Sequence, residues 1–211
     1  MSKARSPYPE FEDWFRTLLS DEVTREADLP APLALDYVGR LFRESGRVLA
    51  GHSDAAVASA LSRVISPEES SELRAVNDAS LPMQRRIGCV EAIGELFAHT
   101  FAPRCERRLS HTGEAASPLN TVCFMWWDTA VLHARPDRWP DLDSACLAVM
   151  RQCLELPSVA CWESALHGLG HWVSDYPEVV RGAIDGFLAS RQRHRPALLD
   201  YAMRARAGSV M

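Results

Sequence analysis

Hydrophobic residues recur along most of the chain with the spacing of an amphipathic helix. Segment 89–101, CVEAIGELFAHTF, places its apolar residues on one face at intervals of three and four, and segment 144–156, SACLAVMRQCLEL, does the same. The alternation of apolar and polar positions that is typical of strands is absent from the sequence. We therefore expect an all-α protein of roughly ten helices.

Serine–proline pairs mark two expected helix starts. Ser66 is followed by Pro67 and, three residues after the serine, by Glu69, which is the arrangement of an N-cap, a first-turn proline and a capping box. Ser117 and Pro118 repeat the first two of these signals. We expect a helix to begin after each serine.

Three prolines recur at a constant interval. Pro103, Pro140 and Pro177 are separated by 37 and 37 residues, and each falls where the second helix of a pair would begin. Acidic residues follow nearly the same interval, because Glu91, Asp128 and Glu163 are separated by 37 and 35 residues. A period of this length with two helices per unit is typical of a helical solenoid.

The repeated units, at about 83–115, 119–156 and 158–193, resemble HEAT-like and related α-solenoid repeats. The resemblance implies antiparallel helical hairpins stacked into a right-handed superhelix around one continuous core; a compact helical bundle is the alternative. The first unit departs from the pattern, since its second helix, APRCERRLSHTG, is short and highly charged. The residues expected in the core are Ala165, Leu169, Ile184, Phe187, Val149 and Met150.

The expected domain organisation has two parts. Residues 1–32 hold an N-terminal helix at about 9–20 and a linker at 21–32, and residues 33–211 form a single α-helical repeat domain that ends in a capping helix at 195–207. Three further segments are helical by pattern but fall outside the 37-residue register, so they are either degenerate repeats or a cap: 33–49, 53–65 and 67–78.

The segment 161–172, CWESALHGLGHW, carries the strongest candidate for chemistry. Glu163, His167 and His171 follow each other at intervals of four, so a helix would place them on one face, opposite an apolar arc. Two histidines one turn apart can chelate a transition metal, with the carboxylate as a third ligand. This is not the zinc-protease motif, because Gly168 stands where that motif has its general base. The other interpretation is a polar helix surface, with Gly168 and Gly170 ending the helix or admitting a close neighbour.

The aromatic cluster FMWWD at 124–128 allows two interpretations. Trp126 and Trp127 point about 100° apart on a helix, so one can enter the core while the other lies at its edge. Trp127 could alternatively be an exposed anchor in a binding groove.

The composition and the absence of certain motifs reduce the number of functions that the chain could have. Lys and Arg number 23 against 28 Asp and Glu, and the net charge of −5 disfavours a nucleic-acid partner. The first residues lack the apolar core of a signal peptide and no uncharged apolar run approaches 18 residues, so we expect a cytoplasmic protein with no membrane partner. The six cysteines form no CxxC pair, and no GxSxG motif or phosphate-binding glycine loop occurs.

We therefore expect a protein-binding helical-repeat module without enzymatic activity or cofactor, of an immunity-like, antitoxin-like or adaptor type, that recognises a basic protein partner. The alternative is a metal-dependent enzyme built on Glu163, His167 and His171. Repeat equivalence predicts that the acidic residues form one row, paired either by arginines such as Arg86 or Arg135 or by the partner. The candidate binding residues are Glu91, Glu95, His99, Trp127, Asp128, Glu163, His167 and His171.

Overall fold

The computed structural model describes residues 7–20, 29–66, 72–190 and 194–210. Within these ranges all regular structure is helical and there is no strand, which confirms the all-α class. The α-helices are α1 (Phe11–Leu19), α2 (Ala31–Arg43), α3 (Ser45–Val48), α4 (Asp54–Ile65), α5 (Met83–Leu96), α6 (Ala102–Arg104), α7 (Pro118–Phe124), α8 (Trp126–Thr129), α9 (Pro140–Glu155), α10 (Val159–Trp172), α11 (Pro177–Leu188) and α12 (Pro196–Arg206). Two 3₁₀ helices, η1 (Glu72–Asn77) and η3 (Ser110–Thr112), and one π-helix, η2 (Phe97–Phe101), complete the set.

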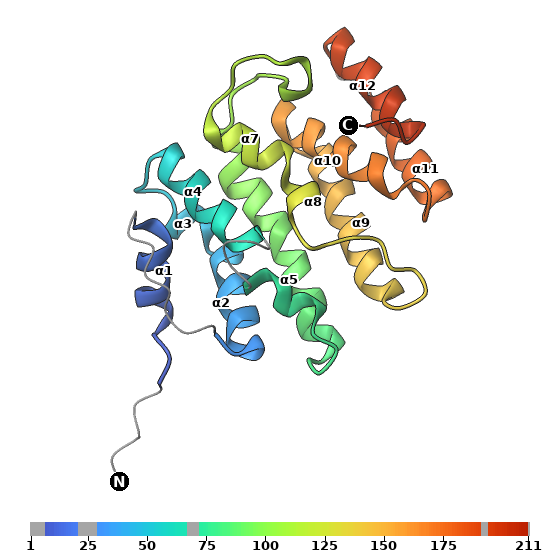
Figure 1. Cartoon of the computed structure of the whole chain (residues 1–211). Coiled ribbons are helices and arrows are strands. Elements are labelled where there is room, and N and C mark those ends of the chain that lie inside the picture. The colour runs from blue at the N-terminus through green and yellow to red at the C-terminus, as the bar shows by residue number, and fades with distance from the viewer. Residues whose placement is uncertain (1–6, 21–28, 67–71, 191–193, 211) are drawn as a thin grey trace.

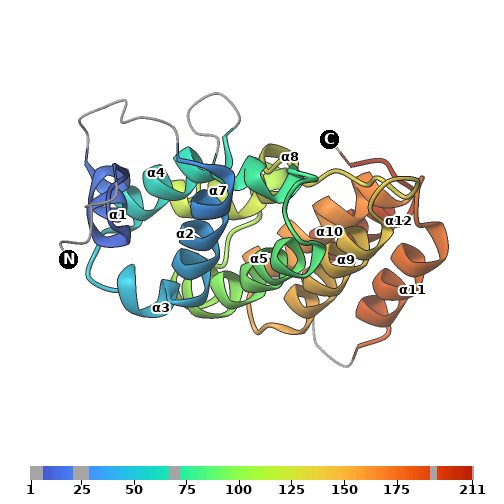
Figure 2. The ribbon, with the colours of Figure 1, turned by 90° about the horizontal axis from the view of Figure 1, so that it is seen from below.

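The longer helices pack side by side in a sequence that runs along the molecule. Helix α2 packs against α5, α5 against α9, α9 against α10, and α10 against α12 (Figure 1). Seen from below, the molecule is elongated, with α1 at one end and α11 and α12 at the other (Figure 2). The short helices α7 and α8 lie against α10 rather than extending this row. A HEAT-like superhelix remains a prediction.

Prolines and serines begin helices as the sequence predicts. Pro140 is the first residue of α9 and Pro177 the first residue of α11, because proline lacks an N–H that would be unpaired there anyway. Ser117 caps α7, since its hydroxyl accepts a hydrogen bond from the backbone N–H of Asn120 at 3.2 Å. The helix start predicted after Ser66 lies in residues 67–71, outside the described ranges.

The first repeat unit differs from the expectation. Pro103 does not open a second helix: it lies in α6, which continues α5 and η2, and the chain leaves the helix at Cys105 with extended backbone angles. The segment 105–117 that follows has only η3 as regular structure. Its many charged residues, including Glu106, Arg107 and Arg108, offer no apolar face to bury, which explains why no second helix forms.

One hydrophobic core joins all parts of the described chain. The six residues expected in the core are all buried there, and Phe11, Trp14 and Leu18 of α1 belong to the same core. Helix α1 is tied to α4 as well, because Arg63 donates to the backbone carbonyl of Ser20 at 2.6 Å. The boundary predicted at residue 32 falls inside α2. None of the helices in the described ranges has both the length and the apolar character needed to cross a bilayer.

Candidate metal centre

Helix α10 is buried along almost its whole length. The side chains of Glu163 and His167 are each 1% exposed, and only His171 reaches the surface, with 40% of its side chain exposed. The expectation that these residues share a solvent-facing side is therefore wrong for the first two. Its physical reason is that α10 is surrounded, since α7, α8, α9, α11 and α12 all pack against it.

Gly168 brings α8 close to α10. A Cβ atom added at Gly168 would lie 2.6 Å from Cγ of Trp127, so no larger residue fits without moving the indole. Trp127 is 2% exposed and Trp126 is fully buried, so both indoles lie in the core and neither is an exposed anchor. Because Asp128 follows Trp127 directly, this contact brings the Asp128 carboxylate to the side of α10 that carries the histidines.

Gly170 plays the same part for the C-terminal segment. A Cβ atom there would lie 2.6 Å from Cγ2 of Val210 and 3.2 Å from the Cα atom of Ala205. The close approach seats α12 on α10 and brings the side chain of Tyr201 to His167. The interpretation that the two glycines admit close neighbours is thus confirmed, and α10 continues through both of them.

Asp128, His167 and His171 converge on one point. The Nε2 atom of His171 lies 2.8 Å from Oδ1 of Asp128, and Nε2 of His167 lies 3.2 Å from Oδ2 of the same carboxylate. The two Nε2 atoms are 3.2 Å apart. In the described part of the chain this is the one group of three such side chains whose ligand atoms lie close enough to hold one metal ion.

These separations fit a transition-metal site. Ligand atoms that lie ~2.0–2.2 Å from one ion, at angles of about 90–110°, are roughly 2.8–3.6 Å apart. All three measured separations fall in that range. Burial lowers the pKa of His167, against the opposing effect of Asp128, which keeps the ring neutral and its lone pair free for a metal. Two nitrogens and one carboxylate oxygen suit zinc, iron or a related divalent ion.

Tyr201 supports the buried histidine from behind. Its hydroxyl oxygen lies 2.5 Å from Nδ1 of His167, and the side chain is 1% exposed. With Nε2 directed at a metal, Nδ1 carries the proton and donates it to this hydroxyl, which fixes the ring. His111 stacks on Tyr201 with ring centroids 4.1 Å apart, so a second histidine covers the tyrosine.

Glu163 serves a different purpose from the one predicted. Its carboxylate accepts hydrogen bonds from the backbone N–H groups of Ser110 and His111 at 3.0 and 2.9 Å, and it lies 2.5 Å from Nδ1 of His111. It therefore anchors the segment 105–117 to α10 and does not join the two histidines. Asp128, which the sequence analysis assigned to the acidic row, takes the third position instead.

The predicted acidic row is not continuous. Glu91 is exposed on α5, Glu163 is buried under η3, and Asp128 pairs with histidines. Within the described residues, no ion pair joins Arg86 or Arg135 to any of the three, so the suggested arginine pairing is wrong.

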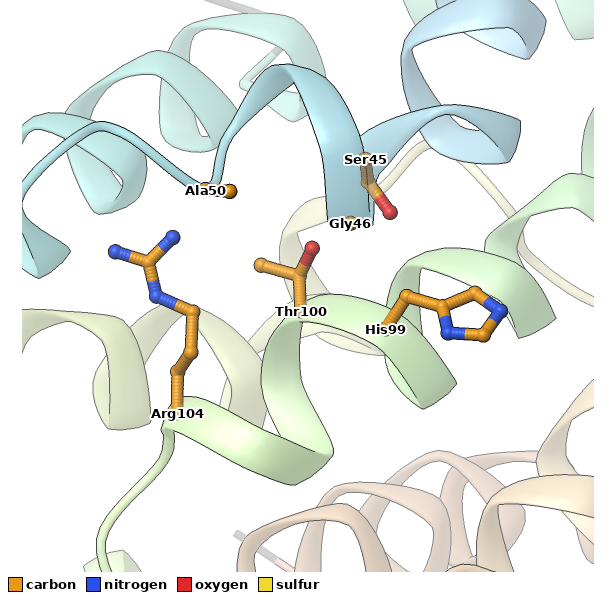
Figure 3. Close-up of a pocket in the computed structure, with 6 residues that line it drawn as sticks. All are labelled: Ser45, Gly46, Ala50, His99, Thr100 and Arg104. Atoms are coloured by element: carbon orange, nitrogen blue, oxygen red, sulfur yellow. The ribbon is translucent and has the colours of Figure 1, made fainter.

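Glu95 and His99 lie apart from the metal centre. They pair with each other on the surface of α5 and η2, with Nε2 of His99 3.1 Å from the carboxylate. His99 also lines a cavity of about 300 Å³ between α3 and η2, together with Ser45, Gly46, Ala50, Thr100 and Arg104. Figure 3 shows Thr100 and Arg104 pointing toward the α3 turn, while the His99 ring points away from them. The Arg104 guanidinium is already occupied by Asp54 and by the carbonyls of Leu49 and His52.

Two residues of the centre had no signal in the sequence analysis. Tyr201 lies in the segment predicted as a capping helix, and His111 lies in the short, charged segment predicted as the second helix of the first repeat unit. The two glycines of the segment 167–171, HGLGH, were the one sequence feature that indicated close neighbours. Small residues on two sides of a helix allow other elements to approach its backbone. Comparison of the chain with protein-family models, with curated proteins and with solved structures gives no match of any of the three kinds.

Proposed function

We propose that the protein binds a divalent transition metal through Asp128, His167 and His171, and that the ion supports metal-assisted hydrolysis. The observation that carries the proposal is the convergence of two Nε2 atoms and one carboxylate within 3.2 Å of each other. Residues 128, 167 and 171 come from two helices, and Gly168 leaves the room that the Trp127 indole occupies between them.

The reaction class follows from the number of ligands. Three protein ligands leave at least one coordination position for water, and zinc lowers the pKa of such a water to about 7. Asp128 and His171 are 34% and 40% exposed, so the outer side of the centre faces solvent and a substrate could reach the ion. His167 lies beneath them and orients the site from the interior.

A metal-free arrangement of the same atoms is the competing interpretation. Each Nε2 atom would then donate a proton to one oxygen of Asp128, and the cluster would act only as a hydrogen-bonded link between α8 and α10. The two interpretations differ in the proton positions on the histidines and in the affinity for metal.

Isothermal titration of the metal-stripped protein with zinc and cobalt distinguishes them. We expect one ion per chain for the wild type, and His171→Ala should weaken binding at least tenfold because it removes one of three ligands. His99→Ala is the matched control, since His99 is also exposed and also pairs with a carboxylate, that of Glu95. Equally weak metal binding by the wild type and both variants would contradict the proposed metal site and the hydrolysis that depends on it.

Protein recognition remains a second proposal. Its support is the elongated row of helices (Figure 2), because stacked helices present extended surfaces, and the exposed carboxylates of Glu91 and Glu95 on α5. A basic partner identified by crosslinking in the native host should bind more weakly in high salt and to the Glu91→Gln, Glu95→Gln double variant. Binding that neither salt nor the double variant alters would rule out recognition by this surface.

A further inference from the structure

Three arginines surround one tryptophan at the N-terminal end of α9. The guanidinium carbons of Arg86, Arg135 and Arg138 lie 4.2, 4.8 and 4.2 Å from the ring centroid of Trp139. Arg86 comes from the first turn of α5, and the other two come from the segment that connects α8 to α9. An indole has two faces, so at least two of the three cations share one face.

The three arginines lack the carboxylate partners that other arginines of this protein have. Arg40, Arg85 and Arg104 each form an ion pair. Arg86 donates only from Nε, to the carbonyl of Val76 at 2.5 Å, and Arg135 donates from Nη1 to the amide oxygen of Asn77 at 3.0 Å. In the described part of the chain, none of the arginines around Trp139 lies within ion-pair distance of an acidic group.

Arg86 carries the clearest sign of a missing partner. The residue is 2% exposed, and its Nη2 atom is buried without a hydrogen-bond acceptor. A buried N–H group of a charged side chain that lacks an acceptor destabilises the protein, because nothing replaces the hydrogen bond it made to water. Burial lowers the pKa of Arg86, and the neighbouring Arg138 and Arg135 lower it further, because like charges disfavour the protonated form.

Two acidic groups close to Arg86 and Arg135 have hydrogen-bond partners of their own. Asp78 accepts a hydrogen bond from the backbone N–H of Ser80 at 2.8 Å and acts on Arg86 only at longer range. Asp143 accepts from the backbone N–H of Arg135 at 2.6 Å and from the Tyr176 hydroxyl at 2.8 Å. Burial raises the pKa of Asp143, while its hydrogen bonds to Arg135 and Tyr176 oppose that shift.

The geometry points to a binding site for a phosphate group at this arginine cluster, with donors from Arg86, Arg135 and Arg138. Guanidinium groups bind phosphate oxygens through paired N–H donors, and a dianion offsets more of the three positive charges than a carboxylate does. Arg138 is exposed and Arg135 is partly buried, so an anion can enter from solvent. The site is independent of the metal centre.

Titration with inorganic phosphate at constant ionic strength, followed by the melting temperature and by ³¹P line width, tests the site. We expect a saturable rise in melting temperature and broadening of the phosphate signal for the wild type. Arg138→Gln should weaken the apparent affinity about tenfold, since it removes a charge-assisted contact from an exposed side chain whose loss leaves the fold intact. Arg151→Gln is the matched control: it removes the same charge from the exposed surface of α9, ~18 Å further along the helix.

A parallel titration with methyl phosphate identifies the source of the group. Binding of the ester as well as the free ion indicates a phosphorylated organic ligand, and binding of the free ion alone indicates inorganic phosphate. The proposal is overturned if neither compound binds, if acetate has the same effect as phosphate, or if Arg138→Gln and Arg151→Gln weaken binding equally.

Discussion

Two pairs of residues at the same helical spacing have opposite surroundings in this molecule. Glu95 and His99 lie one turn apart on α5 and η2, with 55% and 57% of their side chains exposed, and among the described residues they form an ion pair with each other alone. His167 and His171 lie one turn apart on α10, where the first is 1% exposed and both meet a carboxylate from another helix. The comparison teaches that helical spacing brings two candidate ligands together on α10, while the third comes from a helix that packs against it.

Glycine makes the difference between the two helices. Gly168 and Gly170 lie between the two histidines of α10 and face Trp127 and Val210. On α5, an added Cβ at Gly88 would touch nothing within 4 Å. At Gly94, the second glycine of α5, an added Cβ would lie 2.8 Å from Oε1 of Gln152, which is the end of a flexible side chain. The α10 glycines instead face an indole ring and a packed valine, which have less freedom to move aside.

The largest expected effect distinguishes the buried carboxylate of α10 from the exposed one of α5. Glu163→Ala should lower the free energy of unfolding by about 3–5 kcal/mol, because it leaves buried donors of Ser110 and His111 without their acceptor. Glu95→Ala should change it by less than about 0.5 kcal/mol. Urea denaturation measures both, and similar values for the two variants would contradict the assigned burial.

A second comparison uses the glycines. Gly168→Ala should cost ~1–3 kcal/mol and weaken metal binding, because the new methyl group displaces Trp127 and with it Asp128. Gly182→Ala on α11 is the control, since nothing lies within 4 Å of its added Cβ, and it should stabilise the protein by up to about 1 kcal/mol. Gly168→Ala that is as stable as the control would show that α8 does not depend on this contact.

Tyr201→Phe tests the support behind His167. Removing the hydroxyl should reduce zinc affinity roughly 10–100-fold while leaving one ion per chain, because the ring loses the partner that fixes its Nδ1 proton. The melting temperature of the metal-free protein separates this effect from a general loss of packing. Unchanged affinity in Tyr201→Phe would place the hydroxyl outside the metal site.

The pH dependence of stability provides a smaller effect. Burial lowers the pKa of His167, so the unfolded chain takes up a proton before the folded one does as the pH falls. The free energy of unfolding of the metal-free protein should therefore decrease below about pH 6.5, by at most ~1.4 kcal/mol per pH unit for this group. His167→Gln should flatten the slope and His99→Gln should not; the reverse order would contradict the assignment.

The smallest expected effect concerns the surface pair itself. His99→Ala should change the free energy of unfolding by less than about 0.5 kcal/mol and leave zinc affinity unaltered, because an exposed pair is screened by water. A tenfold loss of zinc affinity in this variant would show that the metal binds at Glu95 and His99 and would contradict the site on α10.

The sequence predicted what depends on local pattern. Helical periodicity gave the all-α class, Pro140 and Pro177 gave two helix starts, and the apolar stripes gave core residues such as Ala165 and Ile184. These features depend on residues that are a few positions apart, so a single sequence is enough to predict them.

The composition of the candidate metal centre depends on packing between helices that are distant in the sequence, and it could be predicted only in part. His167 and His171 were identified from their spacing, but the third position was given to Glu163, four residues before His167. Asp128 reaches the site because α8 lies against Gly168, and Tyr201 reaches it because α12 lies against Gly170. A one-dimensional pattern does not specify which of several helices covers another.

The most direct test is anomalous diffraction at the zinc edge from crystals of the zinc-loaded protein. The account predicts one strong peak per chain, ~2.0–2.2 Å from an oxygen of Asp128 and from Nε2 of both His167 and His171. A peak held by Glu95 and His99, a peak at Glu163, or no ordered peak at all would contradict the assigned centre.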